Sequence, residues 1–210
     1  MSVPAQSEVF SLTYKFSAAR DLVLRAFTRA AHLRKWWGPA GFTVAVCGFD
    51  RRPGGVFHYS MQAPVGHRMG DKPVWGKFVY QEIALPERLV VLSAFSDERG
   101  GLTRHPMRPT WPMQVCSDFT FTEQHGQTTV TLSATPYEAT KLERNTFAAS
   151  RALMQKDANE TFAQLKRYLA KLDGNVAVNC GDPPVAPGFT PSFASREQVH
   201  LHCQPPPSAR

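Results

Sequence analysis

Residues 141–172 read KLERNTFAASRALMQKDANETFAQLKRYLAKL, and this stretch decides the fold. Its apolar side chains recur three or four residues apart, which is the period of an amphipathic helix. They are Leu142, Phe147, Met154, Ala158, Phe162, Leu165, Leu169 and Leu172. Most of its lysines and arginines lie on the other side. The pattern predicts one long helix, from Lys141 to Leu172, with an apolar face that must be buried against another layer.

The chain before this helix is rich in strand signals. Two short helices are predicted near its start, at Leu22–Phe27 with Ser17 as N-cap and at Ala30–Trp36 ended by Gly38 and Pro39. Segments rich in β-branched and aromatic residues, separated by turn residues, predict strands. They are Val9–Phe16, Phe42–Phe49, Gly55–Met61, Val74–Ile83, Leu89–Phe95, Met113–Phe121 and Thr128–Ala134. We therefore predict an α+β fold in which a curved antiparallel sheet of about seven strands wraps around the long C-terminal helix and leaves space beneath it.

Length and composition indicate one domain. A chain of 210 residues is long enough for one well-filled core. We assign residues 9–172 to this domain and residues 1–8 to an N-terminal extension. Residues 173–210 contain seven prolines among scattered glycine and serine, a composition that buries too little apolar area to offset the entropy of ordering. We predict that this tail is disordered or loosely packed.

Charge and hydropathy exclude several classes of partner. The formal net charge is +7, but lysine and arginine are spread along the chain without a basic block, so nucleic-acid binding is not predicted. No run approaches the roughly 18 apolar residues of a membrane-spanning helix. The first residues lack the basic and apolar pattern of a signal peptide, and a cytoplasmic location is expected.

Four short motifs occur in a specific order. They are Trp36-Trp37-Gly38-Pro39, Asp50 to Gly55 (DRRPGG), Val74 to Val79 (VWGKFV) and Pro86 to Val90 (PERLV). Their order and spacing, from about Val9 to Leu172, resemble the family of activator of heat-shock-protein-90 ATPase homologues. This family belongs to the START-like, or SRPBCC, superfamily. The resemblance implies a helix-grip fold with a cavity between the sheet and the last helix. Members of this family are linked variously to ligand binding, cyclase-like chemistry, stress response or no known role.

The sequence departs from the family pattern in two places. Where relatives often carry Gly-Trp in the last helix, this chain has Asp157-Ala158, which removes a large ring from the expected cavity. The proline-rich tail is the other departure. The two-domain activator itself carries a further N-terminal chaperone-binding domain, for which this chain has no room before Val9, and this argues against a co-chaperone role.

Alternation along the strands suggests which side chains contact a ligand. Phe57, Tyr59 and Met61 share one face of their strand, and Phe78 and Tyr80 share a face of the next. Alternation does not by itself decide which face points inward. We predict an aromatic and apolar set of ligand-contacting residues: Trp36, Trp37, Phe57, Tyr59, Met61, Phe78, Tyr80, Phe95, Phe119, Phe121, Met154 and Phe162.

Catalytic and cofactor motifs are absent from the sequence. It contains no nucleophile elbow, zinc-protease motif, phosphate-binding loop or dinucleotide fingerprint, so we predict no catalytic residues, metal ligands or cofactor. The long loop from Ser96 to Pro112 suggests a flap, and it carries His105, the best-placed candidate acid or base.

Three functions follow from these observations. The leading hypothesis is a domain that binds a small apolar or aromatic ligand without catalysis. The first alternative is a cyclase- or dehydratase-like enzyme that acts on a polyketide-like or aromatic substrate, using Tyr59, Tyr80 or His105. The second is a module that regulates a chaperone, as the resemblance to activators of the Hsp90 ATPase implies. The ligand and the oligomeric state are not predicted.

Overall fold

The structure is a computed structural model that describes residues 8–67 and 70–173. Its elements follow in the order β1 (Phe10–Phe16), α1 (Arg20–Thr28), α2 (Ala30–Trp36), β2 (Thr43–Phe49), β3 (Val56–Gln62), β4 (Val74–Ala84), β5 (Arg88–Ser96), β6 (Gln114–Gln124), β7 (Gln127–Tyr137), α3 (Lys141–Ala149) and α4 (Arg151–Asp173). The predicted α+β class is confirmed. Apart from Glu8 and Asp173, the N-terminal extension and the proline-rich tail lie outside the described residues.

The strands form one antiparallel sheet, as predicted. Its seven strands lie in the order β1-β7-β6-β5-β4-β3-β2, and each neighbouring pair is antiparallel. The pairing register shifts between Val46 and Gly48 and between Tyr80 and Glu82. Because such bulges bend a strand and increase its twist, they help the sheet to curve.

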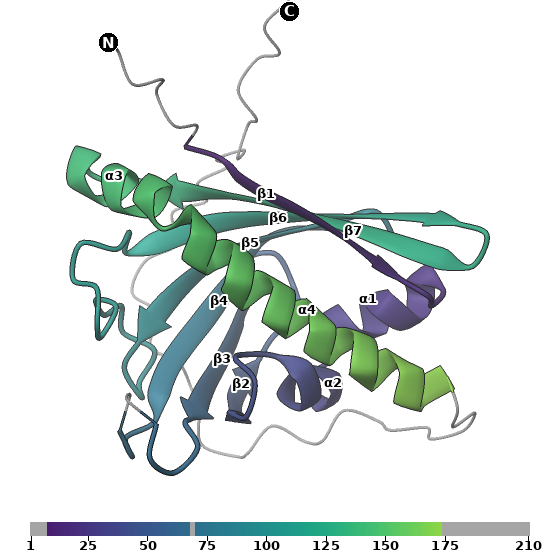
Figure 1. Ribbon diagram of the computed structural model, residues 1–210, viewed down its shortest axis with the longest axis horizontal. Helices are drawn as coiled ribbons and strands as arrows, with labels where there is room; N and C mark the ends of the chain where they lie inside the picture. Colours follow the sequence, from purple (N-terminus) through teal and green to yellow (C-terminus); the bar gives the residue numbers. More distant parts are fainter. Residues whose placement is uncertain (1–7, 68–69, 174–210) are drawn as a thin grey trace, which may run out of the picture.

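Helix α4 crosses the concave face of the sheet, while α1 and α2 lie beside its C-terminal part (Figure 1). Both short helices contact α4, and α1 also contacts β6 and β7. The space between the sheet and α4 therefore has two parts. One is filled by α1 and α2, and the other lies beneath the N-terminal part of α4. Among the helices of residues 8–67 and 70–173, none has both the length and the hydropathy of a membrane-spanning segment.

Two details of the predicted helices are wrong. The single helix expected from Lys141 to Leu172 is divided at Ser150, where φ is −92° and ψ is 8°. The Ser150 hydroxyl donates to the carbonyl of Thr146 at 2.7 Å, a local bond of the kind that competes with a regular helix. In addition, α1 is capped by Ala19 rather than Ser17; the N-cap residue makes no side-chain bond, and the N–H of Arg20 donates instead to the Glu123 carboxylate at 2.8 Å.

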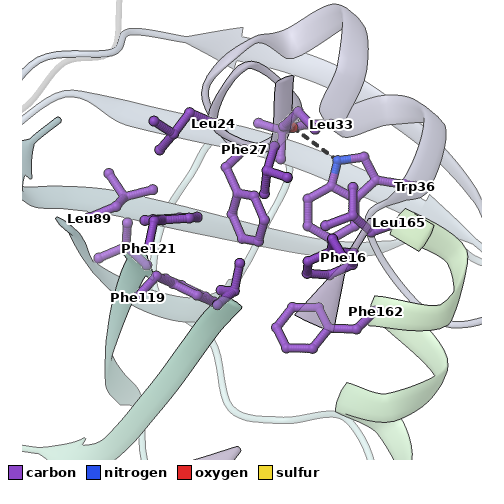
Figure 2. Packing of buried hydrophobic residues seen from close by; sticks show 14 of the residues in the cluster. Phe16, Leu24, Phe27, Leu33, Trp36, Leu89, Phe119, Phe121, Phe162 and Leu165 are labelled. Carbon is purple, nitrogen blue, oxygen red and sulfur yellow. Dashed lines mark hydrogen bonds between the residues drawn. The ribbon is translucent and has the colours of Figure 1, made fainter. Parts of the chain in front are cut away.

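Phe27 of α1 is the centre of a solidly packed region. Its ring centroid lies 4.9 Å from that of Trp36, 5.4 Å from that of Phe119 and 5.2 Å from that of Phe121. Figure 2 shows these rings meeting Phe16 of β1 and Phe162 and Leu165 of α4. We call this group the packed half: Phe16, Phe27, Trp36, Phe119, Phe121, Phe162 and Leu165. All are at most 5% exposed, so this part of the core has little room for a ligand.

Candidate functional site

A cavity of about 360 Å³ lies beneath the N-terminal part of α4. We call its lining the hollow half: Phe10, Trp37, Tyr59, Met61, Gly76, Phe78, Ser93, Ala94, Phe95, His105, Arg108, Trp111, Pro112, Val115, Leu132, Ala134, Phe147, Leu153, Met154, Asp157 and Ala158. Most of these side chains are apolar, and the sheet, the β5–β6 loop (residues 97–113), α3 and α4 all contribute to the wall.

The structure divides the predicted ligand-contacting residues into two groups. One group lines the cavity: Trp37, Tyr59, Met61, Phe78, Phe95 and Met154. The other is buried in the main hydrophobic cluster and does not line it: Trp36, Phe57, Tyr80, Phe119, Phe121 and Phe162. Alternation identifies the inner face of a strand, but a side chain on that face reaches the cavity only where no other element covers it.

Trp36 and Trp37 illustrate this division. Trp36 is 1% exposed, and its indole Nε1–H donates to the carbonyl of Ala26 at 2.9 Å, which fixes it between the two short helices. Trp37 directly follows α2 and is only half-buried. Its ring meets that of Phe78 edge to face, with centroids 4.7 Å apart, in the cavity wall. Adjacent residues thus belong to different halves of the core.

Tyr59 forms part of the cavity floor because its strand neighbour is a glycine. Tyr59 of β3 pairs with Gly76 of β4, and a Cβ atom at Gly76 would lie only 2.7 Å from Cζ and Oη of Tyr59. The phenol ring therefore rests directly on the β4 backbone. Burial raises the pKa of Tyr59 to about 12, and a smaller opposing effect comes from its hydrogen bond with the Trp37 side chain. The hydroxyl accordingly stays protonated at neutral pH.

The β5–β6 loop closes one end of the cavity. The His105 ring packs on Phe95 with centroids 4.5 Å apart, and Trp111 packs on Phe147 of α3 at 5.4 Å. His105, Arg108, Trp111 and Pro112 all contribute to the lining. Sequence reasoning identified His105 and the flap-like loop but missed Arg108 and Trp111. The length of the loop was the only signal that could have indicated them.

Polar contacts hold this loop against the helices. Arg104 forms an ion pair with Glu143 of α3, and Thr146 donates to the hydroxyl of Thr110 at 3.0 Å. The backbone N–H of Thr140, followed by the Arg104 guanidinium, holds the pKa of the buried Glu143 carboxyl below its usual range. The wall formed by the loop is therefore attached to α3 at several points.

Helix α4 covers the cavity with Leu153, Met154, Asp157 and Ala158. These positions repeat with helical spacing and face the sheet. Ala158 presents only a methyl group at the position where the sequence lacks the expected tryptophan, and this small side chain leaves the hollow open. Further along, the Gln164 side chain donates to the carbonyl of Gly38 at 2.6 Å and holds α4 to the end of α2.

Two basic side chains, His105 and Arg108, and one acidic side chain, Asp157, lie in the mostly apolar wall. Burial, and next the charge of Arg108, lower the pKa of His105, whose Nδ1 accepts from the N–H of Met107 at 3.1 Å. Arg108 donates from Nη1 to the Ser150 hydroxyl at 2.9 Å. Within residues 8–67 and 70–173, no group of three or more His, Cys, Asp or Glu side chains is placed to hold a metal ion.

Comparison with known proteins identifies relatives over most of the chain. The family model described as Activator of Hsp90 ATPase homolog 1-like protein matches residues 17–170. No curated protein matches the sequence.

Solved structures share the fold at low sequence identity. A protein from Arthrobacter aurescens has a TM-score of 0.64 at 20% identity, with 81% of this chain and 90% of that one covered. Protein Ms6760 from Mycobacterium smegmatis has a TM-score of 0.59 at 23% identity, covering 76% and 88%. DynU16, described as a putative protein in the dynemicin biosynthetic locus, has a TM-score of 0.51 at 15% identity, covering 78% and 48%. At these identities the likeness shows the fold alone.

Proposed function

We propose that this chain, which belongs to the family of Activator of Hsp90 ATPase homolog 1-like proteins, binds a small apolar or aromatic molecule beneath the N-terminal part of α4. The observation that carries the proposal is the cavity of about 360 Å³, lined by Trp37, Tyr59, Phe78 and other apolar side chains. Small-molecule sites in proteins are concave, mostly apolar and roughly 300 to 1,000 Å³ in volume. The hollow half has these properties.

The forces available in this cavity suit an apolar ligand. Burial of apolar surface stabilises a complex by about 25 cal/mol per Å² before the losses of motion are subtracted. Ring faces and edges at Trp37, Tyr59 and Phe78 offer aromatic contacts in addition to this burial. The attachments of the loop through Arg104 and Thr110 mean that much of the wall is ordered before the ligand arrives, which reduces the entropy lost on binding.

The experiment is a thermal unfolding titration with N-phenyl-1-naphthylamine, a neutral probe with two aromatic ring systems. A ligand that binds only the folded state raises the melting temperature, with about 2.7 kcal/mol of stabilisation at a hundred times its Kd. The matched variant is Ala158→Trp, which places an indole in the cavity. We expect the probe to stabilise the wild type and to have little effect on the variant.

Two results would count against ligand binding in this cavity. The first is no stabilisation by this probe or by any member of a broad library of apolar compounds. The second is equal stabilisation of the wild type and Ala158→Trp, because the probe would then bind elsewhere. Substitution of an exposed residue of the same helix, Ala170→Trp, controls for the added indole.

A second candidate function is catalysis in the same cavity. The observation that favours it is that two titratable side chains, Tyr59 and His105, line the cavity wall. DynU16, a structural neighbour, is described as a putative protein in a biosynthetic locus. The reaction would be a cyclisation or dehydration of a polyketide-like or aromatic substrate. It predicts that Tyr59→Phe or His105→Gln abolishes turnover while the melting temperature is retained. Unchanged turnover in both variants would exclude these residues from the chemistry.

A further inference from the structure

We infer that the ligand is an amphiphile: an apolar ring or chain that carries an anionic group, which Arg108 binds at the loop end of the cavity. This inference rests on the proposed function and gives the chemical class of its ligand. The evidence for it is the presence of charged side chains in the lining, because a purely apolar ligand would give them no role.

The guanidinium of Arg108 has more N–H donors than its bond to Ser150 uses. Arg108 is half-buried in the cavity wall, and its guanidinium donates from Nη1 to the Ser150 hydroxyl. A guanidinium has five N–H donors in a planar fork, so others remain after this bond. In the part of the chain that the structure describes, no carboxylate forms an ion pair with Arg108. A hydrogen bond from a cationic donor is strongest when its acceptor is an anionic group.

Arg104, an arginine of the same loop, has a structural role and serves as a comparison for Arg108. Arg104, four residues earlier in the same loop, is paired with the buried Glu143 and attaches the loop to α3. Arg108 instead bonds to a neutral hydroxyl and lines the cavity. The same loop thus supplies one arginine with its charge satisfied within the protein and one with its charge directed at the site.

His105 adds a second polar group to this end of the cavity. Because its Nδ1 accepts from the backbone N–H of Met107 at 3.1 Å, the neutral ring carries its proton on Nε2. The ring packs against Phe95 in the lining. Near neutral pH this histidine supplies an N–H donor without a full charge, and Arg108 remains the main cationic group there.

The position of Arg108 at the loop end of the lining sets the orientation of the ligand. Asp157 follows Ser150, the partner of Arg108, by seven residues along α4. At 1.5 Å per residue the two backbone positions are about 10 Å apart along the helix axis. Asp157 therefore marks the far end of the lining, and an anionic group is attracted at the Arg108 end. The apolar part of the ligand would then extend past Met154 toward Ala158.

A matched pair of probes tests the inference. The dye 8-anilinonaphthalene-1-sulfonate has the ring system of N-phenyl-1-naphthylamine with one sulfonate added. Loss of a charge-assisted hydrogen bond weakens binding by about ten-fold or more. We expect Arg108→Gln to reduce the affinity for the sulfonate by at least this factor and to leave the affinity for the neutral probe nearly unchanged. Arg99→Gln, an exposed arginine of the same loop that does not line the cavity, is the control and should change neither affinity.

The possible results separate this inference from the proposed function. If Arg108→Gln leaves the affinity for both probes unchanged, or lowers both equally, the anion site is wrong and apolar binding stands. If Arg99→Gln weakens the sulfonate as much as Arg108→Gln, general surface charge explains the preference and the inference fails. If neither probe binds, or Ala158→Trp displaces neither, the proposed function fails and the inference fails with it. Circular dichroism of each variant checks that the fold is retained.

Discussion

The packed half and the hollow half of the core use the same kinds of side chain on the same sheet. Both have phenylalanine side chains on the inner face of the strands, and both include tryptophan and leucine from the strands, helices or loops around them. In the packed half, α1 and α2 insert Phe27 and Trp36 between the sheet and α4 (Figure 2). In the hollow half no helix is inserted, and α4 presents Ala158 and Met154 across the gap. The difference teaches that the cavity depends on what the covering elements present to the sheet, since aromatic side chains occur in both halves.

The largest expected effect is on stability, when the same deletion is made in each half. Phe27→Ala should lower the free energy of unfolding by about 3 to 5 kcal/mol, because it leaves a void among fully buried rings. Phe95→Ala should lower it by about 1 to 2 kcal/mol, because Phe95 is half-buried and already borders a void. Urea unfolding of the two variants measures this directly. Equal losses would mean that the halves are packed alike.

The two halves can also be compared by adding a large side chain to each and measuring the change in stability. Ala26→Trp places an indole where the alanine is 0% exposed, and we expect a loss of about 3 kcal/mol from overpacking. Ala158→Trp should change the free energy of unfolding by less than about 1 kcal/mol, because the cavity accepts the new ring. The measurement is again urea unfolding. A severe loss in Ala158→Trp would show that the space beneath α4 is too small for an aromatic ring.

Much of this architecture could be predicted from the sequence, but its division into halves could not. The helix Ala30–Trp36 was predicted to the residue, and each predicted strand is present with small shifts at its ends. Alternation and helical spacing are local signals, and they are strong in this chain. The break at Ser150 accompanies a bond of its hydroxyl to Thr146, which helical spacing does not reveal, and the position of Arg108 depends on a contact with Ser150, 42 residues away. Likewise the sequence gives no reason to place Trp36 and Trp37 in different halves. Trp36 is buried because it packs against α1, whereas Trp37 lies in the cavity wall.

A smaller effect is the loss of stability at low pH, to which two histidines on opposite faces of the sheet should contribute. Burial is the main cause that lowers the pKa of both His105, in the cavity wall, and His58, which stacks on Trp75. The unfolded chain therefore binds these protons more readily than the folded protein. As the pH falls below the ordinary histidine pKa of about 6.5, the free energy of unfolding should fall. Urea unfolding at a series of pH values should show this decline, and it should become shallower in His105→Gln and in His58→Gln. A slope that neither variant changes would assign the decline to other groups.

The smallest expected effect is a change in one titration curve. The charge of Arg108 is the second cause, after burial, that lowers the pKa of His105. Arg108→Gln should therefore raise the pKa of His105 toward its ordinary value, and it should leave the titration of His58 unchanged. Proton NMR of the imidazole signals measures both. An unaltered His105 curve would mean that the guanidinium does not act on this end of the cavity.

The most direct test of ligand binding in the hollow half uses methionine methyl groups as reporters. Met61 and Met154 line the cavity, whereas Met107 is 45% exposed and does not line it. With methionine labelled at its methyl carbon, N-phenyl-1-naphthylamine should shift the Met61 and Met154 signals together to saturation, and Met107 should move little. Both shifts should disappear in Ala158→Trp. If the probe saturates the protein while the Met61 and Met154 signals stay in place, no ligand enters the hollow half and the proposal is contradicted.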